Sequence, residues 1–122
     1  MLPRRENVIM LKTEAYTDRI IKLYQYMLGV HREQILSKQI LRSGTSIGAN
    51  VAESRNAQSS RDFINKLQIA LKEADETEYW LKKLHTSGYI NQKGYDSMHQ
   101  DNEEIVSILT AIIKTMKQKT NH

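Results

Sequence analysis

Apolar residues recur at steps of three and four along most of the chain, the spacing that places side chains on one face of an α-helix. The two most regular stretches, residues 63–84 and 98–116, alternate steps of four and three as heptad seams do. Each seam indicates a long helix that packs its apolar face against other helices. The seam residues are Phe63, Leu67, Ala70, Ala74, Thr77, Leu81 and Leu84, then Met98, Asn102, Ile105, Leu109, Ile112 and Met116.

Two further helices are predicted in the first half of the chain. Residues 9–28 carry two neighbouring apolar stripes, a face wider than one partner helix needs, which indicates contact with a second surface. Gly29 is expected to end this helix. The stripes are Tyr16, Ile20, Leu23 and Met27 beside Ile21, Tyr24 and Leu28. The helix that follows presents Leu36, Ile40, Gly44, Ile47 and Val51 on or near one face.

Short polar connections separate the predicted helices. Residues 54–60 are polar and predict a turn, with Ser59 or Ser60 capping the third helix. Gly88 is expected to end that helix, and Asn91 to cap the fourth. No segment alternates apolar and polar residues with period two, so no β-strand is predicted.

Four helices of similar length with short links predict an all-α protein, folded as an antiparallel up-down-up-down four-helix bundle. The scarcity of chain breakers, 5 glycines and 1 proline, agrees with long helices. The length of 122 residues predicts a single domain. We expect residues 1–8 and 118–122 to fray.

One stretch of small residues, 43–54, contains the pattern Gly-x-Ser-x-Gly around Ser46. In α/β-hydrolases this pattern forms a nucleophile elbow, which requires a strand before the serine and a helix after it. No strand is predicted here, so we predict no catalytic residue and no enzymatic activity. Gly44 and Gly48 each cost helix stability, and either close approach of another helix or a local kink would explain them.

Polar residues beside these glycines have two interpretations. Ser46, Asn50, Glu53 and Glu73 form either a seam of helix–helix hydrogen bonds that fixes register, or a polar site on an assembled surface. Di-metal four-helix bundles carry a Glu-x-x-His motif on each of two helices. This sequence has one comparable motif, Asp96-x-x-His99, and no second copy. We therefore predict no metal, no cofactor and no small-molecule substrate.

Composition is that of an ordinary globular domain, with 39% hydrophobic and 26% charged residues. The chain has no cysteine, which excludes disulfides and fits a cytoplasmic location. No apolar run approaches the roughly 18 residues that a membrane span needs, so no membrane association is expected.

The net charge of +4 is unevenly distributed. Residues 1–61 carry ten basic and five acidic residues, residues 62–104 five and nine, and residues 105–122 three and none. Basic clusters attract nucleic acid or other acidic partners, although a solvated surface explains them equally well. The candidate nucleic-acid-binding residues are Lys38, Arg42, Arg55, Lys114, Lys117 and Lys119.

Three segments carry a resemblance to a known family: residues 46–53 (SIGANVAE), 62–64 (DFI) and 69–81 (IALKEADETEYWL). They resemble the four-helix-bundle family of 23S rRNA intervening-sequence proteins, which are themselves similar to the accessory protein of diversity-generating retroelements. The resemblance implies a bacterial homo-oligomer, a pentameric ring, with RNA or DNA as partner. It implies no catalytic residues.

Two functional hypotheses follow. The first is a non-catalytic oligomer that binds RNA or DNA through the basic surface of the assembled ring. The second is a protein-interaction scaffold with no nucleic-acid partner, motivated by the wide apolar face of the first helix and by Tyr79 and Trp80, residue types enriched at interfaces.

Overall fold

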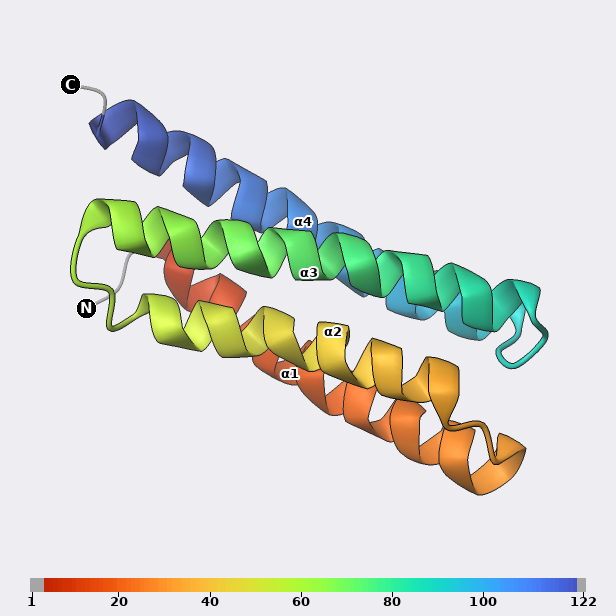
Figure 1. The fold of residues 1–122 in the computed structure, drawn as a ribbon. Helices are drawn as coiled ribbons and strands as arrows, with labels where there is room; N and C mark the ends of the chain where they lie inside the picture. The colour runs from red at the N-terminus through yellow and green to blue at the C-terminus, as the bar shows by residue number, and fades with distance from the viewer. Residues whose placement is uncertain (1–3, 121–122) are drawn as a thin grey trace.

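The computed structural model of the chain describes residues 4–120, and side chains over residues 7–120. Four helices account for most of these residues: α1 (Arg4–Tyr26), α2 (Ile35–Ser54), α3 (Ser60–Thr86) and α4 (Gln92–Thr120) (Figure 1). A short π-helical turn, η1 (Met27–His31), follows α1. Residues 4–120 contain no strand, which confirms the predicted all-α class.

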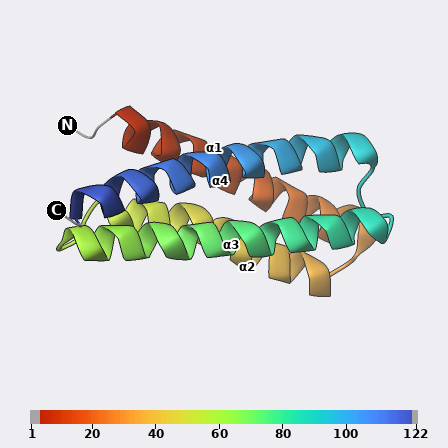
Figure 2. The same cartoon turned by 90° about the horizontal axis from the view of Figure 1, so that it is seen from above.

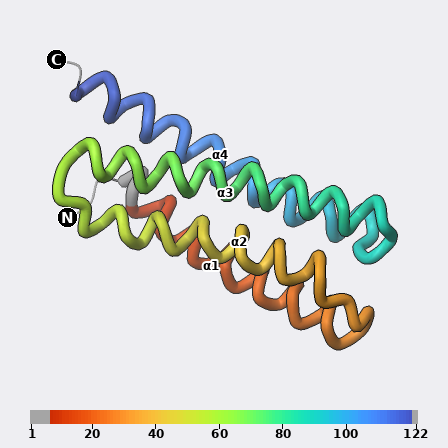
Figure 3. Tube along the Cα trace, in the orientation of Figure 1, coloured from red at the N-terminus to blue at the C-terminus, as the bar shows by residue number. Residues whose placement is uncertain are grey.

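The helices run alternately up and down, and each contacts the next one along the chain (Figures 1 and 2). The last helix, α4, returns to contact α1, which closes the predicted four-helix bundle. The Cα trace in Figure 3 shows which helix ends lie at the same end of the bundle. The starts of α1 and α3 and the ends of α2 and α4 meet at one end of the bundle.

The predicted seams form the core. Every seam residue of α3 and α4 is buried except Phe63 and Met116, which are half-buried. Ile20 of α1 and Ile40 of α2 are completely buried, and they join the seam residues in one hydrophobic cluster. Burial of each large aliphatic side chain contributes about 1.5–3 kcal/mol, so the heptad spacing is the main source of stability.

α1 and α2 approach closely at the two glycines of α2. A Cβ atom on Gly44 would lie 2.8 Å from three side-chain carbons of Ile20. One on Gly48 would lie 2.6 Å from Thr17 Oγ1 and 3.2 Å from the Thr13 carbonyl oxygen. Since α2 continues as an α-helix to Ser54, close packing rather than a helix break accounts for both glycines.

Polar side chains inside the bundle connect neighbouring helices. Thr77 Oγ1 of α3 lies 3.0 Å from Ser43 Oγ of α2, and both residues are buried. Asn102 Nδ2 of α4 donates to the Ala74 carbonyl at 2.9 Å, while its Oδ1 has no hydrogen-bond partner among the described residues. These bonds tie α3 to both of its neighbours at fixed register.

The predicted helix caps are present. Ser59 Oγ accepts a hydrogen bond from the Asp62 N–H at 3.0 Å, and Asn91 Oδ1 accepts one from the Gly94 N–H at 2.8 Å. Gly88 follows the end of α3 with a φ of 84°, the left-handed conformation in which glycine costs least.

One detail of the predicted helix ends was wrong. Gly29 lies within η1, and the left-handed residue that ends this segment is Arg32, with a φ of 54°. The N–H groups of Arg32 and Glu33 both bond to the Met27 carbonyl, which holds the turn. Residues 4–8 and 118–120 are helical, as parts of α1 and α4, and their fraying stays a prediction. Residues 1–3 and 121–122 lie outside the described residues.

We expect Gly44→Ala to lower the free energy of unfolding by about 1–2 kcal/mol. The new methyl group would overpack against Ile20, which outweighs the gain of up to about 1 kcal/mol in helix propensity. Gly29→Ala is the control, because a Cβ there has no atom within 4 Å. Urea titration measures both variants, and equal stabilities for the two would contradict the close approach.

Glu33 precedes α2 and its carboxylate accepts hydrogen bonds from the N–H groups of Ile35, Leu36 and Ser37 at 2.9–3.0 Å. Partial desolvation acts to raise the pKa of Glu33, but these bonds outweigh it and lower the pKa below its ordinary value of 4.5. The charged form is therefore favoured by folding, so its stabilisation is present above pH 4.5 and is lost as the pH falls through the lowered value.

We expect Glu33→Gln to cost about 0.5–1 kcal/mol at pH 7, the low end for a lost helix cap because solvent screens this site. The difference from the native chain should shrink when unfolding is measured below pH 4. A constant difference from pH 7 to pH 3 would show that the charge of Glu33 does not matter.

Candidate nucleic-acid interface

Basic side chains gather where the helix ends meet. Arg55 follows the end of α2, Arg61 lies in the first turn of α3, and Lys114, Lys117 and Lys119 occupy the last turns of α4. All five are exposed. We call this set the basic end. It forms because antiparallel helices bring residues that are up to 64 positions apart in the sequence to one end of the bundle.

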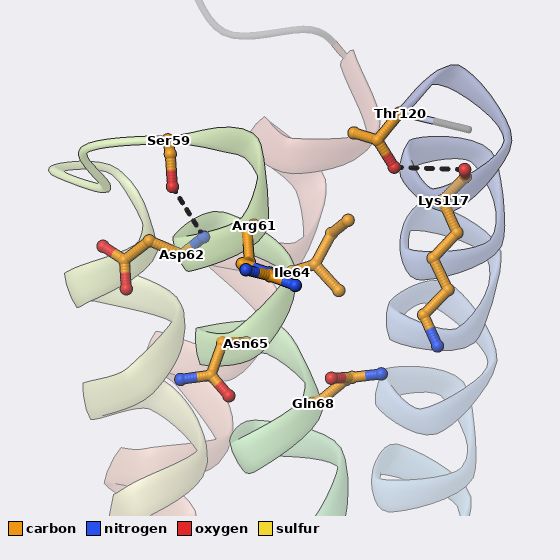
Figure 4. Close-up of a pocket in the computed structure, with 8 residues that line it drawn as sticks. All are labelled: Ser59, Arg61, Asp62, Ile64, Asn65, Gln68, Lys117 and Thr120. Carbon is orange, nitrogen blue, oxygen red and sulfur yellow. Dashed lines mark hydrogen bonds between the residues drawn. The ribbon is translucent and has the colours of Figure 1, made fainter. Parts of the chain in front are cut away.

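A cleft of about 770 Å³ opens in the basic end, between the start of α3 and the end of α4. Figure 1 shows the end of α4 diverging from α3 there. Figure 4 shows Lys117 and Thr120 on one side of the cleft and the α3 residues on the other. The lining residues are Ser59, Arg61, Asp62, Ile64, Asn65, Gln68, Lys117 and Thr120.

The local sequence of α3 creates one wall of the cleft. Arg61, Asn65 and Gln68 are spaced by four and three, which places them on one face of the helix. Ile64 contributes the apolar floor, and it is buried. The wall therefore offers one guanidinium and two carboxamides, all hydrogen-bond donors suited to phosphate or ribose oxygens.

The charge of the basic end is largely uncompensated. None of its five residues forms an ion pair with another described residue. Lys66, nearby on α3, is different: its hydrogen bond to Glu53 at 2.9 Å raises the pKa of the Lys66 ammonium. Asp62 is the one carboxylate among the cleft-lining residues.

The structure does not place all six predicted basic residues at the same end of the bundle. Lys38 is exposed near the start of α2, at the opposite end of the bundle from the cleft. Arg42 lies farther along α2 and pairs with two carboxylates of α3, Glu73 at 3.4 Å and Glu76. This pairing neutralises Arg42 and makes it a contact between α2 and α3.

The other polar residues of the small-residue stretch make local contacts. Ser46 Oγ donates to the Arg42 carbonyl at 2.7 Å, and Asn50 Nδ2 donates to the Ser46 carbonyl at 2.8 Å, both one turn back along α2. Glu53 reaches α3 through Lys66. The serine of the Gly-x-Ser-x-Gly pattern thus lies inside a helix, without the turn that an elbow requires.

Sequence reasoning missed Arg61, Asn65 and Gln68 as residues of the cleft. Their spacing on the polar side of α3 was a usable signal, but nothing in the sequence indicated that Lys117 faces them. Their position across the cleft from Lys117 depends on how α4 leaves the bundle, which is set by packing between distant segments.

A second cluster was also missed, where α3 contacts α4 near the connection between them. His99 Nδ1 lies 2.6 Å from Glu78 Oε1, and the Tyr95 hydroxyl donates to Glu78 Oε2 at 2.6 Å. Burial and the bond to Glu78 raise the pKa of Tyr95 to about 12. Glu103 lies one turn after His99, so that Glu78, His99 and Glu103 bring three potential metal-ligand atoms within 4.8 Å of one another.

Among the described helices, none has an apolar stretch of the length needed to cross a bilayer. Comparison with curated proteins gives no match. Among solved structures, the chain is similar to a crystal structure of a protein with unknown function from the S23 ribosomal protein family of Bacteroides thetaiotaomicron VPI-5482. The two share 51% sequence identity with a TM-score of 0.89, over 90% of this chain and 98% of that one.

The family model for 23S rRNA-intervening sequence proteins matches residues 5–111. This range includes all of α2 and α3 and most of α1 and α4. It also contains the three segments on which the sequence resemblance rests. The chain belongs to the 23S rRNA-intervening sequence protein family.

Proposed function

We propose that this protein is a non-catalytic, oligomeric RNA-binding bundle that holds the phosphate backbone at its basic end. The observation that carries the proposal is the cleft between α3 and α4, lined by Arg61 and Lys117 and flanked by further cations without an ion-pair partner among the described residues. The name of the family, which refers to 23S rRNA, makes RNA the first nucleic acid to test.

The chemistry of the cleft favours contacts with the phosphate backbone of a nucleic acid over recognition of its bases. Lysine and arginine bind phosphates through charge and release of counterions, independently of sequence. The residues that line the cleft include no aromatic side chain on which a base could stack. We therefore expect shape and charge, rather than base identity, to determine affinity.

Assembly would strengthen this binding. One basic end offers few phosphate contacts, whereas several copies held together act through effective concentration. Large apolar side chains remain exposed on α1, on η1 and at the start of α2, which supports a contact between copies. These exposed residues include Leu11 (64%), Ile21 (38%), Tyr26 (44%), Val30 (63%) and Ile35 (76%).

The double variant Arg61→Glu/Lys117→Glu tests the interface. We expect the affinity for single-stranded RNA, measured by fluorescence anisotropy at 50 mM salt, to fall at least tenfold. The slope of log K against log salt should decrease by about 1.4, because two phosphate contacts are lost.

Lys82→Glu/Lys93→Glu is the matched control. It makes the same change in net charge with two exposed lysines at the opposite end of the bundle. Equal losses in both double variants would show that only net charge matters. No RNA binding by the native chain at low salt would refute the proposal itself.

The oligomer is tested by light scattering. We expect the native chain to scatter as about five times the mass of one chain, in line with the pentamer that the family resemblance implies. Ile21→Glu should lower this mass by placing a charge on the exposed apolar face of α1, while Gln100→Glu, at an exposed polar position of α4, should not. A native monomer would contradict the assembly.

A protein-interaction scaffold is the second candidate. Tyr79 is 52% exposed on α3, packs edge-on against Trp80 and lies beneath the Lys83 ammonium. An exposed tyrosine supported by a partly buried tryptophan is typical of interface anchors. If this function is correct, a protein partner should remain bound to the native chain after nuclease treatment and be lost with Tyr79→Ala.

A further inference from the structure

We propose that Glu78, His99 and Glu103 form a zinc-binding site that links α3 to α4. Three ligand atoms, a histidine nitrogen and two carboxylate oxygens, already lie within 4.8 Å of one another. Histidine nitrogen and carboxylate oxygen are both zinc ligands, and zinc sites with three protein ligands leave a further position for water.

The two ligands at the centre of the site are held in place by Tyr95. The Tyr95 hydroxyl donates to Glu78 Oε2 at 2.6 Å, which leaves Oε1 directed at His99. The Tyr95 ring stacks on the His99 ring, with centroids 5.4 Å apart and planes within 16°. On its other face, Tyr95 stacks on His85 at 5.0 Å. One residue thus orients both ligands, as outer-shell partners do in metal sites.

Small movements of these side chains would convert the present hydrogen bond into zinc coordination. His99 Nδ1 and Glu78 Oε1 are 2.6 Å apart because a hydrogen bond joins them. Zinc with bonds of about 2.0–2.2 Å would separate the two atoms to roughly 3.4 Å in a tetrahedral site, and the bridging proton would leave to solvent. Glu103 is exposed at one turn from His99, so its side chain is able to close onto the ion.

The position of the site favours metal capture over a simple ion pair. Glu78 is 15% exposed and His99 39% exposed, so the pair is partly shielded but reachable from solvent. The hydrogen bond between Glu78 and His99 is complete without a third residue, yet Glu103 places a further carboxylate beside it. Imidazole favours zinc over magnesium, which prefers an octahedral shell of oxygen ligands.

Isothermal titration of the full chain, without an affinity tag, with zinc chloride tests the site. We expect one zinc ion per chain with a dissociation constant of about 10 µM or tighter, and a rise in Tm of a few degrees, because the ion binds only the folded arrangement of α3 and α4. Magnesium chloride at 1 mM should produce neither effect.

Single substitutions distinguish zinc bound at this site from zinc bound by other histidines. We expect His99→Gln to abolish binding and Glu103→Gln to weaken it at least tenfold. Glu104→Gln removes the same charge one residue along, where the side chain pairs with Lys12 instead, and should bind zinc as the native chain does. Cobalt should give visible d–d absorption in the native chain and none in His99→Gln. Native-like zinc affinity in His99→Gln, or no binding by the native chain at 100 µM zinc, would overturn the proposal.

Discussion

The bundle depends on how closely α2 approaches α1. Gly44 leaves the space that Ile20 fills, and Gly48 leaves the space for Thr17 and the backbone of α1. Because Ile20 is completely buried against this surface, a larger residue at position 44 has to displace it or separate the helices. The stretch that resembles a nucleophile elbow is therefore a packing surface, and its serine bonds within its own helix.

The packing of the helix pairs determines where charge accumulates. Antiparallel closure brings the ends of α2 and α4 to the start of α3, which gathers Arg55, Arg61 and Lys117 at one end. Glu53, at the end of α2, pairs with Lys66, and Glu73, farther along α3, pairs with Arg42. Basic residues in these ion pairs stabilise helix contacts, and those outside them are available to a polyanion. The proposed RNA function is thus a consequence of topology together with ion pairing.

Local sequence predicted the helices well, since heptad spacing, Ser59, Asn91 and Gly88 act within a turn or two. It failed at Gly29, which was expected to end the first helix. The helical segment ends instead at Arg32, in the left-handed conformation, where the N–H groups of Arg32 and Glu33 bond to the Met27 carbonyl. Contacts between distant segments were not predictable. The pairing of Arg42 with Glu73, the approach of Lys117 to the wall of α3 and the meeting of Glu78 with His99 all depend on tertiary packing.

A double-mutant cycle of Gly44→Ala and Ile20→Ala tests most directly whether this stretch is a packing surface. The three atoms nearest to a Cβ at position 44 all belong to the Ile20 side chain, so Ile20→Ala should remove most of the cost of the new methyl group. We expect a coupling free energy of about 1 kcal/mol or more from urea unfolding of the four proteins. If Gly44→Ala costs the same in both backgrounds, the close approach of α1 and α2 is not what the glycine provides.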